Sequence, residues 1–155
     1  MLKRLTALAI GMVLVALSGV AVHAHDDIMA HRECHQCGMD RKVYGYSRML
    51  IVYEGGAEVG VCSLHCAVTE MDGHREKKVT TLLVADRDSH ALIPADTASW
   101  VIGGRRRGVM TQRPKWAFAT IDAARAFVAS NGGAIVRWDE ALAAAREDAL
   151  PKPGR

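Results

Sequence analysis

The chain has 155 residues, of which half are apolar, about a quarter are charged and only 5% are aromatic. These proportions exclude a disordered chain, a collagen-like repeat and a protein with several membrane spans. They predict a core built mostly from Ala, Val, Leu and Ile. The net charge is +3, from 20 basic and 17 acidic residues, which is too small to favour binding to nucleic acid.

Residues 1–24 have the pattern of a cleavable export signal. A basic start that contains Lys3 and Arg4 precedes the uncharged apolar run Leu5–Val22, and small residues allow cleavage after Ala24. Acidic residues follow the run, and no cysteine ends it, so we expect neither a membrane span nor a lipid anchor. Removal of Lys3 and Arg4 lowers the net charge from +3 to +1. The mature protein is expected in the periplasm, where unprotected thiols form disulfides.

The first half of the mature chain predicts an arm, a turn and four regular elements. Residues 25–33 are polar and are interpreted as a flexible arm, and Cys34–Met39 form a tight turn with two thiols. The pattern then predicts strand, strand, helix and strand, over residues 48–53, 57–62, 63–72 and 79–85. Glu54–Gly56 is the hairpin turn, and Ser63 caps the helix.

The second half repeats this order of elements. Two strands, a helix capped by Thr120 and a closing strand are expected over residues 99–102, 115–119, 120–131 and 134–138. Asp139 is expected to cap a last helix over 140–150, which Pro151 ends, and 151–155 form a tail. We therefore predict an α+β fold with two similar ββαβ units, over 34–90 and 91–150, plus a C-terminal helix.

The spacing of the four cysteines is typical of a treble-clef metal site. Cys34 and Cys37 lie on the turn, Cys62 ends the second hairpin strand, and Cys66 follows one helical turn later. The hairpin should fold the helix start back onto the turn and so bring four sulfurs together. The positive end of the helix should favour thiolates at Cys66 and Cys62.

Three chemical states of the cysteines remain open from spacing alone: a structural zinc site, a copper(I) site, or disulfides. Zn²⁺ with four thiolates carries a charge of −2, whereas Cu⁺ with four would carry −3. Copper(I) should therefore use fewer thiolates and add neutral thioethers. Met39, two residues after Cys37, and Met110, in the loop between Arg105 and Lys115, are the candidates for thioether ligands.

Several motifs together resemble the NosL family of nitrous oxide reductase accessory proteins. They are the Cys-Gly-Met turn, the second cysteine pair, and segments of the second half, over residues 34–39, 47–48, 62–67, 100–104, 108–111, 115–118 and 132–133. The resemblance covers roughly residues 33–145. It implies two ββαβ units and an exported or lipid-anchored copper(I) metallochaperone that supplies nitrous oxide reductase.

The resemblance also implies a ligand set. The family's copper site uses the cysteine of the Cys-Gly-Met motif and a distant methionine, which are Cys37 and Met110 here. This chain differs in lacking a lipid-anchoring cysteine and in carrying four cysteines. The metal is thus held by Cys37 and Met110, by all four thiols (Cys34, Cys37, Cys62 and Cys66), or by two separate sites.

Histidines and arginines supply secondary hypotheses. His25, His31 and His35 belong either to a solvated polar tail or to an auxiliary arm that captures Cu²⁺, and His65 is either a ligand or a solvent-facing residue. Arg105–Arg107 is interpreted as a solvated turn, or as a patch that steers an acidic partner.

The sequence thus predicts a metal-binding protein rather than an enzyme, because no catalytic triad, phosphate loop or nucleotide fingerprint occurs. We expect a periplasmic copper(I) metallochaperone whose partner is a copper enzyme there, either nitrous oxide reductase or another cupric enzyme. The alternative is an interaction module built around a structural Cys₄ zinc site.

Overall fold

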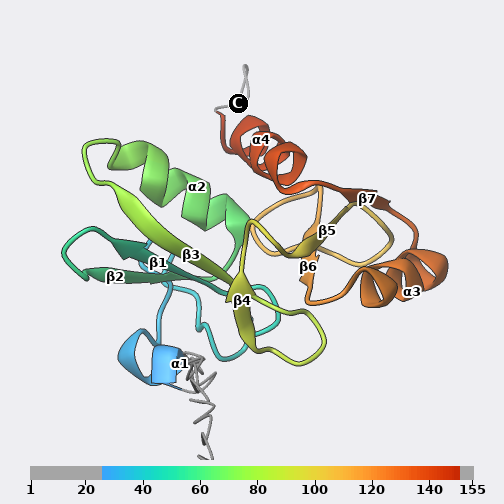
Figure 1. Cartoon of the computed structure of the whole chain (residues 1–155), viewed down its shortest axis with the longest axis horizontal. Coiled ribbons are helices and arrows are strands. Elements are labelled where there is room, and N and C mark those ends of the chain that lie inside the picture. The colour runs from blue at the N-terminus through green and yellow to red at the C-terminus, as the bar shows by residue number, and fades with distance from the viewer. Residues whose placement is uncertain (1–25, 151–155) are drawn as a thin grey trace, which may run out of the picture.

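A computed structural model describes residues 26–150, which form two antiparallel sheets and four helices (Figure 1). The first sheet has the strand order β2-β1-β3-β4, with β1 at Met49–Tyr53, β2 at Glu58–Val61, β3 at Val79–Ala85 and β4 at Leu92–Pro94. The second has the order β6-β5-β7, with β5 at Ser99–Ile102, β6 at Lys115–Phe118 and β7 at Ala134–Val136. The helices are α1 (Asp26–Ala30), α2 (Leu64–Gly73), α3 (Ile121–Asn131) and α4 (Trp138–Ala149). The predicted α+β class is confirmed.

The helices lie on different sides of the two sheets (Figure 1). Helix α2 covers one face of the first sheet and α1 lies on the opposite side, whereas α3 packs on the second sheet. Helix α4 packs against both α2 and β5 and so joins the two halves. Its inner face is made of Ala141, Ala144 and Ala145, all buried. Small side chains let this helix approach closely, which explains how a chain with few aromatic residues closes its core.

The central strand β1 organises the first sheet. Met49 pairs with Val61 of β2 on one side and with Val84 of β3 on the other, and all three side chains are buried. Gly55 and Gly56 form the hairpin turn with φ values of 89° and 87°, a region that favours glycine. The predicted hairpin is therefore confirmed, with each strand slightly shorter than expected.

Helix starts follow the sequence signals at two of three positions. Ser63 Oγ accepts a hydrogen bond from Cys66 N at 3.4 Å, and Thr120 Oγ1 accepts one from Ala123 N at 3.2 Å. The prediction of Asp139 as the cap of the last helix is wrong, since α4 begins one residue earlier at Trp138. Strand β4 was not predicted, because three residues carry too little periodicity to be recognised.

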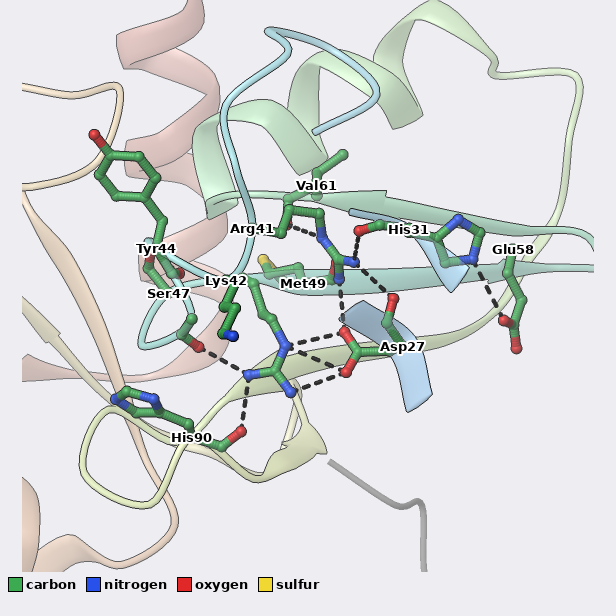
Figure 2. Close-up of polar contacts among 12 residues, drawn as sticks. Asp27, His31, Arg41, Lys42, Tyr44, Ser47, Met49, Glu58, Val61 and His90 are labelled. Atoms are coloured by element: carbon green, nitrogen blue, oxygen red, sulfur yellow. Dashed lines mark hydrogen bonds and ion pairs between the residues drawn. The ribbon is translucent and has the colours of Figure 1, made fainter. Parts of the chain in front are cut away.

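The segment after residue 25 differs from the expected flexible arm. It forms the short helix α1, and Asp27 is buried between two fully buried arginines, Arg41 and Arg48. Figure 2 shows the contact of Asp27 with Arg41. Asp27 Oδ2 accepts from Arg41 Nη2 at 2.7 Å, and Asp27 Oδ1 accepts from Arg48 Nη2 at 2.9 Å. A polar stretch is thus anchored beneath the first sheet by a buried ion cluster.

Within residues 26–150, no helix is long and apolar enough to cross a bilayer. The signal expected at residues 1–24, His25 and the tail at 151–155 lie outside the described residues.

Replacing Asp27 with Asn should destabilise the reduced, metal-free protein by about 3–5 kcal/mol, because it leaves buried guanidinium groups without their carboxylate. The measurement is urea unfolding followed by far-UV circular dichroism. The matched control is Glu54→Gln, since Glu54 pairs with Lys78 on the exposed surface; it should leave the midpoint unchanged. Equal midpoints for both variants would show that the buried cluster contributes nothing.

Candidate metal centre

The four cysteines meet at one point, as their spacing predicted. Cys37 Sγ lies 3.6 Å from Cys62 Sγ, which lies 3.7 Å from Cys66 Sγ, and the third side of this triangle is 3.8 Å. With Cys34 included, all four sulfurs lie within 4.8 Å of one another. Within residues 26–150, this is the one group of at least three His, Cys, Asp or Glu residues with such geometry.

Backbone hydrogen bonds shape the turn that carries the first two cysteines. Cys34 N donates to Met39 O at 2.8 Å, and Gly38 N donates to Cys34 O at 2.8 Å. Gly38 has φ +73°, which side chains with a Cβ rarely adopt. His35 N donates to Gly60 O at 3.0 Å and thereby ties the turn to strand β2.

Gly60 is required by close packing. A Cβ there would lie 2.5 Å from the His31 Cβ and 2.6 Å from Arg41 Nη1, well inside van der Waals contact. The Arg41 side chain crosses this glycine and donates to Val61 O at 3.2 Å, directly before Cys62 (Figure 2). The ion cluster under the sheet therefore fixes the strand end that presents the third thiol.

The separations among the sulfurs of Cys37, Cys62 and Cys66 fit a tetrahedral metal ion. Metal–sulfur bonds of about 2.3 Å in a tetrahedron place the sulfurs about 3.8 Å apart, close to the three measured distances. Thiolates suit both Zn²⁺ and Cu⁺. All four cysteines are free, and their sulfurs lie well beyond the S–S bond length of about 2.05 Å. The structure thus describes a thiol cluster and not a disulfide pair.

Contacts among the sulfurs of the metal-free cluster shift the thiol pKa values in opposite directions. Hydrogen bonds from Cys62 and Cys66 hold the pKa of Cys34 far below its usual value. The bond to Cys34 raises the pKa of Cys62 to about 12, and the same contact raises the pKa of Cys66. These directions oppose the effect expected from the helix end, which favours thiolates at Cys62 and Cys66. S–H donors at contact distance outweigh the partial charge of the helix end.

Exposure differs among the sulfur residues. Cys34, Cys62 and Cys66 are at most 2% exposed, whereas Cys37 is only partly buried. Cys37 is therefore the ligand that solvent, an arriving metal ion or another protein would meet first.

The two candidate methionines occupy different surroundings. Met39 is half-buried and packs against the core that contains the cysteines. Met110 is 44% exposed and has φ 58°. It lines a surface hollow with Thr111, Gln112, Arg113 and Asp148, which no cysteine lines. The structure thus brings the four thiols together but does not bring Met110 to them.

Asp148 of α4 holds the loop that carries Met110. Its carboxylate accepts from Thr111 Oγ1 at 2.9 Å, and it also accepts from Lys115 and pairs with Arg113 at 2.9 Å. Burial opposes ionisation of Asp148, but the hydrogen bonds from Lys115, Thr111 and Arg113 outweigh it and lower its pKa to about 2. The anchor therefore stays charged at neutral pH.

His65 lies between two cysteines in sequence, but it lines a small hollow with Ser47, Thr111 and Lys115. Its Nδ1 is buried without a hydrogen-bond partner within the described residues. Burial first, and then the charge of Lys115, lower the pKa of His65, so the ring is neutral at physiological pH. The structure supports neither an exposed His65 nor its membership of the four-thiol group.

Sequence reasoning missed a buried carboxylate beside the cluster. Glu70 is 1% exposed, one helical turn beyond Cys66, and its Oε2 accepts from Gln36 Nε2 at 2.5 Å. Its Oε1 accepts from Tyr53 OH at 3.4 Å, and His35 Nε2 lies 3.8 Å from Oε2. These contacts clamp the cysteine turn onto α2. The available signal was an acidic residue on the apolar face of a predicted helix.

Comparisons with known proteins agree with this geometry. The family model described as NosL matches residues 25–145. The crystal structure of the copper chaperone NosL from Shewanella denitrificans superposes with a TM-score of 0.57 at 23% identity. The match covers 70% of this chain and 87% of that one, and it shows a shared fold. No curated protein matches the sequence.

Metal binding should release protons, because Cys62 and Cys66 are protonated in the empty cluster at neutral pH and must lose their protons to become ligands. Each proton released makes the logarithm of the apparent affinity rise by about one per pH unit, so we expect a slope of at least two between roughly pH 6 and pH 8. Titration of reduced protein with Zn²⁺ or Cu⁺ in a weakly buffered solution that contains a pH-indicator dye measures the protons released. Repeating the affinity measurement at several pH values gives the slope. Affinity that is independent of pH would contradict the assignment.

Proposed function

The chain belongs to the NosL family, and on that premise we propose that it is an exported copper(I) metallochaperone. The family is one of copper chaperones and not of enzymes. The observation that carries the proposal is the group of four free thiols within 4.8 Å, three of them buried and one at the surface. Such a site holds a soft cation away from water while leaving one ligand open to a partner.

Copper(I) is expected to bind fewer than four of these thiolates. Two or three thiolates from Cys34, Cys37, Cys62 and Cys66 would leave less negative charge on a monovalent ion than four would. Transfer then proceeds by ligand exchange, in which an incoming sulfur replaces Cys37 and the copper stays in the +1 state. The protein supplies the sulfur ligands and the low-polarity surroundings, and no electron is moved.

Cys37 and Met110 form the ligand pair that we propose for the copper in transit. Cys37 is the accessible thiol, and Met110 is an exposed thioether on a loop anchored to α4. The neighbouring Val109 belongs to the same core cluster as the cysteines, and a change of the loop conformation would be needed to bring Met110 to the thiols. Met39 packs against that core and is the second candidate thioether.

A structural zinc site is the second candidate, favoured by sulfur separations that match a tetrahedral ion. In that case the metal would stabilise the turn, the hairpin and α2, and the protein would serve as an interaction module.

We also propose that the two ββαβ units are related by duplication. In each sheet the first strand is central, giving β2-β1-β3 and β6-β5-β7, and each helix follows its second strand behind a hydroxyl cap. The second unit, over residues 91–150, contains no cysteine. It would therefore support the metal-binding first unit, over residues 34–90, and contribute Met110.

Periplasmic delivery completes the proposal. The signal pattern at residues 1–24 supports export, and the family resemblance supports nitrous oxide reductase as recipient, with another periplasmic cupric enzyme as the alternative. Residues 25–33 would follow the cleavage site.

Cys37→Ser and Met110→Leu should each weaken Cu⁺ binding about tenfold or more, because each removes a soft ligand. Neither should shift the urea midpoint of the metal-free protein, since both side chains are at least partly exposed. Competition with a chromophoric Cu⁺ chelator under anaerobic, reducing conditions measures the affinity, with Met29→Leu, 83% exposed on α1, as the matched control. Unchanged Cu⁺ affinity, together with loss of folding in Cys62→Ser and Cys66→Ser, would favour structural zinc instead.

Metal analysis of protein taken directly from the periplasm separates the chemical states. We expect close to one copper per chain and, after its removal, four titratable thiols, since all four cysteines are free in the structure. One tightly bound zinc would support the alternative, and fewer than four thiols would show disulfide formation.

A further inference from the structure

A basic hollow lies between the loop after β3 and the loop after β5. Its lining includes three arginines, Arg87, Arg106 and Arg107, and its volume is about 470 Å³. That is within the range of binding pockets, about 300–1,000 Å³. Resting on the chaperone function proposed above, we propose that this hollow docks an acidic peptide segment of the protein that receives the metal.

The charge of the lining favours a carboxylate ligand. Asp88 is its one acidic residue, and that carboxylate is engaged by Arg87 at 2.5 Å. Arg106 and Arg107 are exposed, and neither pairs with a carboxylate anywhere in residues 26–150. Two adjacent guanidinium groups without counter-charges match the fork geometry of carboxylates.

Two of the three lining arginines, Arg87 and Arg106, have contacts that hold them in place before a ligand arrives. Arg105 N donates to Asn131 O at 2.8 Å, and the Arg105 guanidinium donates to Ser130 O, so the loop is fixed to the end of α3. Arg106 Nε donates to Asn131 Oδ1 at 3.3 Å. On the opposite wall, Arg87 lies 5.2 Å from the ring centre of Phe127. Such preorganisation lowers the entropic cost of binding.

An aromatic wall makes a peptide a better occupant than a small inorganic anion. Tyr46 and Trp116 line the hollow with their rings stacked at 6.0 Å, and His90 lies 6.4 Å from Tyr46. Trp116 is buried behind Tyr46, so the partly exposed Tyr46 ring offers most of the apolar surface to the side chains that flank the carboxylates of a peptide. Free phosphate or sulfate would use only the arginines.

The hollow is close to the metal centre. Trp116 also lines the smaller hollow that contains Ser63 and His65, which flank Cys62 and Cys66 in sequence. Ser47, next to Tyr46, donates from Oγ to Cys62 O at 2.8 Å. A segment docked against Tyr46 and Trp116 would therefore bring its protein beside the thiol cluster.

Binding of a synthetic peptide to the copper-loaded, full-length mature protein tests the proposal. The probe is a labelled acetyl-Glu-Asp-Phe-Glu-Asp-amide, measured by fluorescence anisotropy at low salt, and its partner probe replaces every Glu and Asp by Gln and Asn. We expect R106E/R107E to weaken binding of the acidic peptide about tenfold or more. The control R75E/R125E changes the net charge equally at exposed sites elsewhere, and it should stay within about twofold of wild type.

Besides unaltered peptide affinity in R106E/R107E, three outcomes would overturn the docking site. The first is an equal loss of affinity for the acidic peptide in both double variants, and the second is equal binding of the neutral peptide by wild type. The third is displacement of the acidic peptide by inorganic phosphate at matched charge concentration, which would indicate a small-anion site. Circular dichroism and Cu⁺ affinity of R106E/R107E should match those of wild type. If wild type fails to bind Cu⁺, the chaperone function is refuted. If wild type binds Cu⁺ but R106E/R107E binds the acidic peptide as tightly as wild type does, only the docking site is refuted.

Discussion

The buried guanidinium of Arg41 connects the parts on which the metal centre depends. It binds Asp27 of α1, reaches Met49 O of the central strand at 3.0 Å, and donates to Val61 O just before the third cysteine. The guanidinium donates to five acceptor oxygens in all, which matches its five N–H donors and exceeds the three of a lysine ammonium. Its path over Gly60 is open because that residue has no side chain.

This arrangement also bears on the charge of the thiol cluster. Burial lowers the pKa of the Arg41 guanidinium, while Asp27 and the Cys34 thiolate both act against that change. A positive group in the low-dielectric interior near Cys34 favours the negatively charged form of the sulfurs. The same guanidinium thus serves the packing of the first sheet and the electrostatics of the ligand set.

Local signals predicted most of the fold and the grouping of the thiols. The hairpin glycines, the caps Ser63 and Thr120 and the cysteine spacing act within a few residues, so they are visible in the sequence. The role of Asp27 was missed because its partners are 14 and 21 residues away and follow no period. Glu70 was missed similarly, since its partner Gln36 lies 34 residues earlier. The effect of the sulfur contacts on the thiol pKa values could not be predicted, because these contacts join residues that meet only in three dimensions.

The unequal exposure of the four sulfurs has a consequence for the lifetime of the protein. An oxidant arriving from solvent meets Cys37 first, and Cys62 Sγ lies 3.6 Å behind it. A sulfenic acid at Cys37 would condense with a neighbouring thiol of the cluster to give a disulfide and water. The metal-free form is therefore susceptible to thiol oxidation in an oxidising compartment. A bound cation occupies the sulfur lone pairs and so protects the thiols from the oxidant. The rate of metal binding after export would then determine how long the four cysteines of each molecule can still bind metal.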